Sequence, residues 1–108
     1  MDVSFDARGG ELVVKLIGEL DHHAARGTGE KIDFEICMRR PVSVCIDFEK
    51  LSFMDSSGLA VIMGRRKTCM ALDIPLYISG VTGSIRKVLL MSGIQKYVKM
   101  KEYDYESR

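Results

Sequence analysis

The sequence has no tryptophan, only two prolines and three cysteines among its 108 residues, and no long apolar run. Cys37, Cys45 and Cys69 are odd in number, lie far apart and form no C-x-x-C pair, which argues against a disulfide framework and against a zinc site. No stretch approaches the roughly 20 apolar residues that cross a bilayer, and the first residues lack the basic and apolar regions of a secretion signal. We therefore expect buried, reduced thiols in a cytoplasmic protein that does not bind a membrane.

An excess of charge of one sign is also missing. Sixteen lysines and arginines stand against fifteen aspartates and glutamates, which leaves a formal charge of +1. Proteins that bind nucleic acid or an anionic membrane surface usually carry a basic patch, so we predict neither partner. A hydrophobic fraction of 46% and a charged fraction of 29% are ordinary for a globular protein. A chain of this length builds one core, and we predict a single domain over residues 1–108.

Catalytic motifs are missing as well. No P-loop, G-x-G-x-x-G or G-x-S-x-G occurs. The run Asp21-His22-His23 is the triplet with which DHH phosphoesterases bind manganese, but those enzymes need further aspartate motifs on a much longer chain. A serine nucleophile would need His22 or His23 as its base, and nothing in the sequence brings either one to a serine. We predict a protein that is not an enzyme and has no metal or cofactor site.

Hydrophobic periodicity predicts alternating strands and helices. An edge strand around residues 2–6 is expected to pair with residues 11–18 as a hairpin through Gly9 and Gly10. Further strands are expected at residues 42–48, 76–78 and 97–100. Helices are expected from a cap at Asp21 to about Met38, from residues 55–58 to about 71–73, and from a cap at Thr82 to a stop at Gly93. This order predicts an α/β fold with a mixed sheet of four to five strands and helices packed against it.

Two regions of the chain are expected to be less regular. Gly27 and Gly29 lie inside the first helix, where each glycine costs roughly 1 kcal/mol relative to alanine. We therefore expect this helix to fray or bend there. The polar tail Glu102–Arg108 is expected to be mobile.

The stretch SFMDSSGLAVIMGRRK, residues 52–67, places Ser56 and Ser57 where a helix begins. Short polar side chains cap helix starts by accepting backbone N–H bonds, and this is the ordinary interpretation of such a sequence. A hydroxyl at that place is also exposed beside the positive end of the helix dipole, so it can carry a phosphate without unfolding its helix. Both interpretations are open on these residues alone.

Other residues of this stretch have expected roles too. Asp55 can orient the turn by accepting backbone N–H bonds, Ser57 can help to cap or pack the turn, and Gly58 allows another backbone to approach closely. The helix is expected to turn one face to the core, formed by Leu59, Ile62, Met63 and Met70. On the exposed side we expect a flat docking surface of small apolar residues, formed by Ala60, Val61 and Gly64. Arg65 and Arg66 are expected either to be solvated or to meet an acidic group on a partner.

Three blocks together carry a family resemblance. They are Leu51–Lys67, the upstream run Gly18–His23 with the sequence GELDHH, and the downstream run Met91–Ile94 with the sequence MSGI. In this order they resemble the bacterial anti-sigma factor antagonists, which are single STAS domains, and GELDHH resembles their sporulation branch, the anti-sigma-F factor antagonists. The resemblance implies that the serine directly after the aspartate, Ser56, is the phosphoacceptor, with Ser57 as second choice. It also implies that Asp21 lies beside that serine on the partner-binding face.

The resemblance implies a function as well. The unphosphorylated chain would bind an anti-sigma factor that is also a serine kinase, and the sigma factor would be released. Phosphorylation of Ser56 would end this binding, and a serine phosphatase would reset the switch. ATP and Mg²⁺ would belong to the kinase. Two alternatives are a STAS module that senses a small ligand or nucleotide, and a structural domain in which the Asp-Ser-Ser-Gly turn is only a helix cap.

Overall fold

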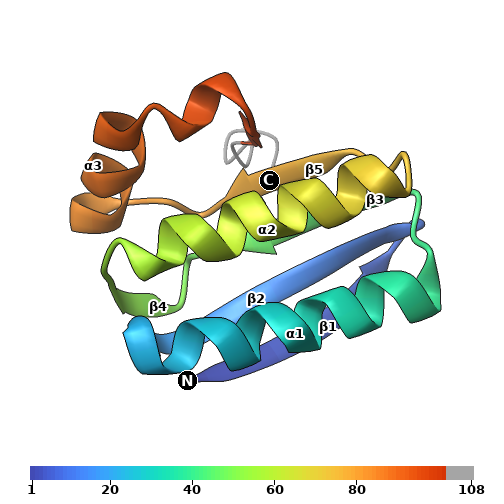
Figure 1. The fold of residues 1–108 in the computed structure, drawn as a ribbon, viewed down its shortest axis with the longest axis horizontal. Coiled ribbons are helices and arrows are strands. Elements are labelled where there is room, and N and C mark those ends of the chain that lie inside the picture. Colours follow the sequence, from blue (N-terminus) through green and yellow to red (C-terminus); the bar gives the residue numbers. More distant parts are fainter. Residues whose placement is uncertain (102–108) are drawn as a thin grey trace, which may run out of the picture.

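The computed structural model describes residues 1–101, so the expected mobility of the tail Glu102–Arg108 lies outside the described residues. After an opening hairpin, helices separate the strands as predicted, except that β3 and β4 follow each other directly (Figure 1). The elements are β1 (Asp2–Arg8), β2 (Glu11–Leu20), α1 (His22–Arg39), β3 (Ser43–Asp47), β4 (Leu51–Met54), α2 (Ser57–Ala71), β5 (Leu76–Ser79), α3 (Gly83–Ser92), a 3-10 turn (Ile94–Lys96) and β6 (Lys99–Met100).

The strands form one mixed sheet in the order β1-β2-β3-β5-β6, with β4 paired to β2. The β1–β2 pair is antiparallel and the other pairs are parallel. Residues 1–101 thus contain six strands, one more than the upper limit expected, and the additional strand is β4. Because β2 is ten residues long and β3 only five, β3 pairs with the first half of β2 and β4 pairs with its end.

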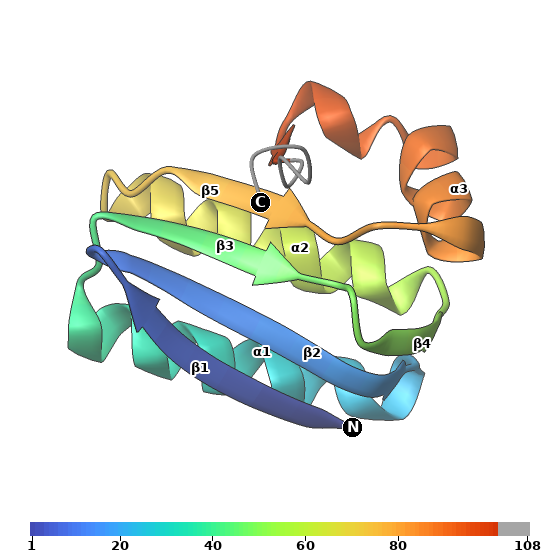
Figure 2. The same cartoon turned by 180° about the vertical axis from the view of Figure 1, so that it is seen from behind.

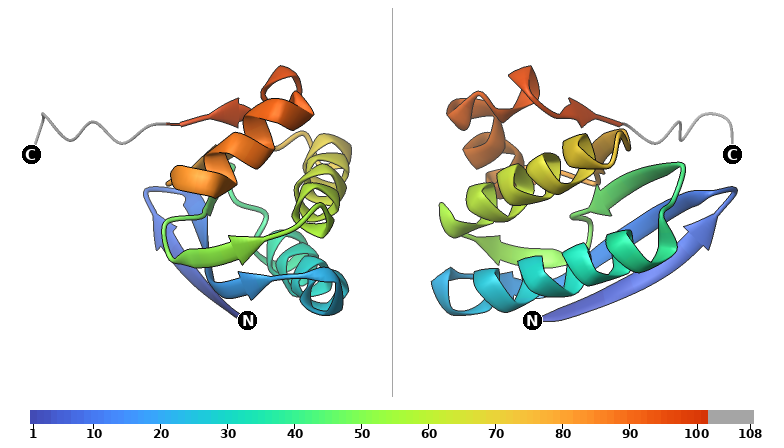
Figure 3. Two further views of the ribbon diagram at one scale, coloured as in Figure 1. Left: turned by 90° about the vertical axis from the view of Figure 1, so that its left-hand side faces the viewer. Right: turned by 45° about the vertical axis from the view of Figure 1, so that its right-hand side comes forward.

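Two layers build the core. Helices α1 and α2 lie side by side on one face of the sheet (Figure 1). The opposite face carries no helix within residues 1–101, and α3 lies at one end of the molecule (Figures 2 and 3). Side chains that alternate along the strands point toward the helices and are buried there. The most deeply buried of the core include Leu12, Val14, Leu16, Leu20, Ile32, Ile36, Val44, Ile46, Phe48, Ile62, Ile78 and Leu89.

The expected fraying of α1 at its glycines is not seen, because the helix runs unbroken from His22 to Arg39. Burial of its inner face, which includes Ile32 and Ile36, offsets the low helix propensity of glycine. Gly29 also has a packing reason: a Cβ there would collide with the guanidinium of Arg65 on α2, whose Cζ would be only 2.9 Å away. At Gly27 an added Cβ would meet nothing within 4 Å, and nothing in the structure explains that glycine.

Two side chains of α2 differ from expectation. Val61 was expected on an exposed face but is only 3% exposed, because α1 packs along this side of α2 and covers it. Met70 was expected in the core but is 61% exposed, and Cys69 is buried in its place. At about 3.6 residues per turn, the residue seven positions after Ile62 returns to the core line, and the residue eight positions after it does not.

The last helix is close to prediction. Gly93 ends α3 in the left-handed conformation, with φ of 79°, and Ile85 and Leu89 are buried beneath it. Thr82 does precede the helix, but its side chain makes no capping hydrogen bond. No helix within residues 1–101 combines the length and the hydropathy that crossing a bilayer would require.

Candidate functional site

The starts of α1 and α2 lie side by side at one edge of the sheet. Parallel pairing of β2 with β4 sets Leu20 opposite Met54, and the backbone N–H of Asp55 then donates to the Leu20 carbonyl at 3.4 Å. Strands β2 and β4 lead almost directly into α1 and α2, so the N-cap residues Asp21 and Ser56 follow two adjacent strands of the sheet. The structure therefore brings the Asp21 loop and the Asp-Ser-Ser-Gly turn together, although 35 positions separate Asp21 from Ser56 in the sequence.

Asp21 caps α1 as the sequence predicts. Its side-chain Oδ1 accepts the backbone N–H of Ala24 at 3.0 Å. This hydrogen bond holds the pKa of the Asp21 carboxyl below its ordinary value. The carboxylate is thus ionised near neutral pH and places a negative charge beside the second helix start.

In the turn before α2 the capping group is Asp55 and not a serine. Oδ1 of Asp55 accepts the backbone N–H of Ser57 at 2.8 Å, and its carbonyl accepts the N–H of Gly58 at 3.0 Å. This is the orienting role that the sequence predicts for Asp55. The Ser56 side chain makes no capping hydrogen bond, and the residue is exposed. Its hydroxyl is consequently accessible to another molecule.

Gly58 is required for a different reason from the one expected. The residue is buried, and a Cβ there would collide with Cγ and Sδ of Met54 and lie 3.4 Å from Cδ2 of Leu20. Side chains, and not a second backbone, therefore make the close approach. The glycine lets the first turn of α2 sit directly on β4 and β2.

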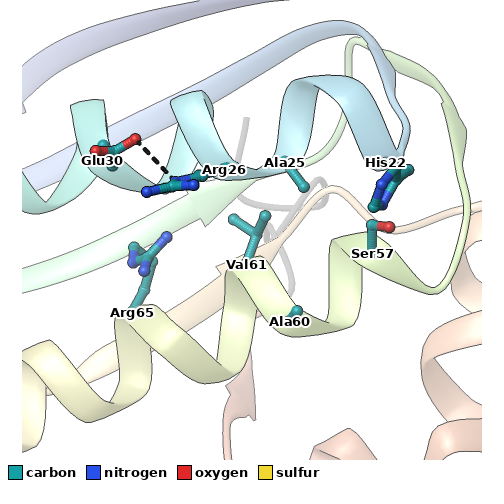
Figure 4. Close-up of a pocket in the computed structure, with 9 residues that line it drawn as sticks. His22, Ala25, Arg26, Glu30, Ser57, Ala60, Val61 and Arg65 are labelled. Atoms are coloured by element: carbon teal, nitrogen blue, oxygen red, sulfur yellow. Dashed lines mark ion pairs between the residues drawn. The ribbon is translucent and has the colours of Figure 1, made fainter.

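A groove runs between α1 and α2 from these helix starts (Figure 4). Its volume is about 380 Å³, and its lining includes Val61 and the small residues Ala25, Gly29 and Ala60. Polar and charged lining comes from His22, Arg26, Glu30, Ser57 and Arg65. The flat surface expected from Ala60 and Val61 is thus one wall of a groove. Gly64, the third residue expected there, is half-buried and does not line it.

Arg65 links the two helices. Its side chain is 12% exposed, and its Nε lies 2.9 Å from Oδ1 of Asp33 on α1, although this N–H is not aligned for a hydrogen bond. The hydroxyl of Thr68 donates to the same Asp33 oxygen at 2.8 Å. The side chain is therefore neither solvated nor turned to a partner, as had been expected, but engaged within the molecule. Arg66 is likewise engaged, because its Nε donates to the Tyr97 carbonyl at 3.1 Å.

The α1 side of the groove was missed by the sequence analysis. His22, Ala25 or Arg26, and Gly29 or Glu30 recur at helical spacing, so the sequence does show that they share one side of α1. Nothing local to α1 shows that this side meets α2. That contact depends on pairing between β2 and β4, which is set by residues far apart in the chain.

The remaining histidines and cysteines form no separate centre. The His22 and His23 rings contact each other edge to face, with 5.7 Å between centroids, and no group of three or more potential metal ligands occurs within residues 1–101. The three thiols are free, but Cys37 is exposed, contrary to the expectation of burial. Burial raises the pKa of the Cys69 thiol to about 11 and also raises that of Cys45.

Comparisons with known proteins agree with this fold and site. The family model of the STAS domain matches residues 2–104. The anti-sigma F factor antagonist of Paenibacillus polymyxa is 33% identical over 106 residues, which cover 98% of this chain and 89% of that protein. The chain therefore belongs to the STAS domain family.

Two solved structures connect the chain to a particular group within that family. The anti-sigma factor antagonist SpoIIAA in its unphosphorylated form is 30% identical, with a TM-score of 0.80 over 98% of this chain and 91% of that one. The Bacillus cell fate determinant SpoIIAA in the phosphorylated form is also 30% identical, with a TM-score of 0.72 over 98% and 95%. The predicted resemblance to anti-sigma factor antagonists, and to the anti-sigma-F branch, is confirmed.

Proposed function

We propose that this chain is an anti-sigma factor antagonist whose binding is switched off by phosphorylation of Ser56. The observation that carries this proposal is the state of the Ser56 hydroxyl, which is exposed and takes no part in capping α2. Asp55 performs that task instead, through its hydrogen bond from the Ser57 N–H. Ser56 can therefore be modified without loss of a helix cap. That a 30% identical relative has been solved in phosphorylated and unphosphorylated forms supports this interpretation.

The proposed binding surface covers the two helix starts and continues into the groove. The surface is centred on Ser56 at the start of α2 and includes the Asp21 carboxylate at the adjacent start of α1. Exposed Ala60 offers apolar contact area, whereas Val61 lines the groove but is only 3% exposed. The charged side chains of the lining, Arg26, Glu30 and Arg65, lie toward one end of the groove (Figure 4). A partner segment of matching shape would bury this area. The full set of residues proposed for partner binding is Asp21, Asp55, Ser56, Ser57, Gly58, Ala60, Val61, Gly64 and Arg65, with Gly58 and Arg65 acting by shaping the surface.

The partner would be an anti-sigma factor that is also a serine kinase. Bound to the unphosphorylated chain, it releases its sigma factor. ATP and Mg²⁺ are held by the kinase, so the antagonist needs no cofactor of its own. In the transfer step, Oγ of Ser56 forms a bond to the γ-phosphorus of ATP while the bond from that phosphorus to the bridging oxygen breaks. ADP leaves, and the hydroxyl proton passes to a base on the kinase.

Release follows from electrostatics. A phosphate adds about −1.5 to −2 charges at the centre of the interface. Like charges across an interface cost several kcal/mol, and each 1.4 kcal/mol weakens binding about tenfold. Because the phosphate lies at the N-terminus of α2, we expect the fold itself to change little on modification. A serine phosphatase would restore binding.

Mass spectrometry after incubation with the candidate kinase and magnesium ATP tests this proposal. We expect one phosphate on Ser56 and loss of the complex as it accumulates. Ser56→Ala should bind the kinase and stay bound in ATP, whereas Ser56→Asp should bind weakly. Ser57→Ala is the matched control for the acceptor and should still take up one phosphate, on Ser56. Absence of phosphate with a demonstrably active kinase, or phosphate on Ser57 alone, would refute Ser56 as the switch.

The groove supports a second candidate function, the sensing of a small ligand or nucleotide. Its volume of about 380 Å³ is in the range of small-molecule sites, and Arg26 and Arg65 line it. Native mass spectrometry of the purified chain, or a thermal-shift screen with nucleotides, distinguishes the two functions. Stoichiometric ligand that is displaced by filling the groove, for example with Ala60→Phe, would favour the sensing function.

A further inference from the structure

The pairing of β2 with β4 brings the start of α1, where His22 lies, next to the start of α2, where Ser56 lies. Leu20 pairs with Met54, and the Asp55 N–H continues this pairing to the Leu20 carbonyl. Two residues beyond each member of that pair come His22 and Ser56. Figure 4 shows the His22 imidazole and the side chain of Ser57 next to each other at one end of the groove. Ser57 directly follows Ser56 in the chain.

The other charged side chains of the two helix turns and of the groove lining already have partners within the chain. The carboxylates of Asp21 and Asp55 accept backbone N–H bonds at the two helix starts. Further along the groove, Arg26 lies 3.8 Å from Glu30, and Arg65 is paired with Asp33. His22 is exposed and makes no ion pair with another described residue. Among the basic side chains that line the groove, it is therefore the one without an ion-pair partner in residues 1–101.

We propose that His22 is the residue that pairs with the phosphate on Ser56, donating a ring N–H to a phosphate oxygen as the imidazolium. This inference rests on the proposed phosphorylation of Ser56 and names the group of this chain that receives the phosphate. An imidazolium and a phosphate dianion within hydrogen-bond reach stabilise each other's charged forms. Pairing should raise the pKa of His22 and lower the second pKa of the phosphate by roughly half a unit to one unit each.

His23 provides a matched control on the same helix turn. It touches the His22 ring, but it lines a different cavity, of about 510 Å³, together with Met1, Gly18, Glu19, Asp21 and Ala24. Its charge also helps to lower the pKa of Asp21, so its electrostatic partner is the Asp21 carboxylate. Removal of His23 should therefore change the phosphate much less than removal of His22.

The test is a pair of NMR titrations on the full chain carrying phosphoserine at position 56, introduced during translation so that no kinase is needed. Imidazole carbon–proton signals and the ³¹P signal are followed between about pH 5 and pH 9. We expect the His22 pKa to be roughly 0.5 to 1 unit higher than in the unmodified chain. His22→Gln should raise the second pKa of the phosphate, His23→Gln should leave it nearly unchanged, and His22→Lys should keep it low.

Equal His22 pKa values in the modified and unmodified chains, or equal effects of the two glutamine variants on the phosphate, would overturn the pairing. Those results would leave the switch itself intact, because kinase transfer to Ser56 and loss of the complex are measured separately. Conversely, an active kinase that leaves Ser56 unmodified would overturn the proposed function. The titration of the phosphoserine chain would then still show whether the two groups are in contact.

Discussion

Alanine at positions 27 and 29 of α1 should have different effects on stability. Neither glycine has the positive φ that would penalise a side chain, so both substitutions should improve helix propensity. The tertiary surroundings differ, however. A Cβ at position 27 points into open space, whereas at position 29 it collides with the guanidinium of Arg65.

The magnitudes follow from the burial of the displaced pair. Gly27→Ala should stabilise the protein by about 0.5 to 1 kcal/mol, the helix propensity difference. Gly29→Ala makes the same gain, but it must move Arg65, whose side chain is 12% exposed, away from Asp33, which is 35% exposed. A charged contact at this intermediate burial is worth about 1 to 2 kcal/mol. The net effect should be between zero and a loss of about 1.5 kcal/mol.

Urea unfolding measured by far-UV circular dichroism is a suitable assay, since the chain has no tryptophan. A difference of about 1 to 2 kcal/mol between the two variants is readily resolved and corresponds to several degrees in Tm. A double-mutant cycle completes the test. In an Arg65→Ala background the collision no longer exists, and Gly29→Ala should recover the same gain as Gly27→Ala.

Two results would refute this reasoning. One is a Gly29→Ala variant as stable as Gly27→Ala in the wild-type background, which would mean that Arg65 does not occupy the surface of Gly29. The other is a gap between the variants that persists without Arg65, which would place its cause elsewhere in α1.

Three further predictions concern other parts of the site and core. Asp21→Ala should lower Tm because the helix cap is lost, whereas Asp21→Asn should keep most of the wild-type Tm. The folded-state pKa of Asp21 lies below its ordinary value of 3.8, so the ionised carboxylate should stabilise the fold above pH 3.8. An acid titration of Tm should show this stabilisation disappear as the pH falls through the folded-state pKa of Asp21. Gly58→Ala should destabilise by about 1 to 3 kcal/mol through overpacking, while Gly64→Ala, which meets open space on the same helix, should stabilise by up to about 1 kcal/mol in urea unfolding. Near neutral pH a thiol reagent should modify exposed Cys37 at once and Cys69, with its pKa of about 11, only as the chain unfolds; equal rates in the native protein would contradict this.

Much of the fold was predictable because its determinants are local. The hairpin turn at Gly9 and Gly10 takes the positive φ values of 55° and 87° that glycine tolerates, and Gly93 ends α3 in the same region. Asp21 and Asp55 cap or orient helix starts through residues no more than three positions away. Both partners of such a contact lie within a few residues of each other, so residue type and spacing predict it.

The site as a whole depends on contacts between distant segments. The sequence alone determined the order of the elements other than β4, the two helix starts and the exposed serine at the second of them. Only the tertiary structure decided that β4 joins β2, which brings the two helix starts together, and that α1 covers Val61 to leave a groove. It also decided that Arg65 packs on Gly29 and pairs with Asp33, residues 36 and 32 positions away in the sequence. The physical reason is that pairing register and helix packing depend on many side chains acting together, and no local pattern records which distant residue will complete a contact.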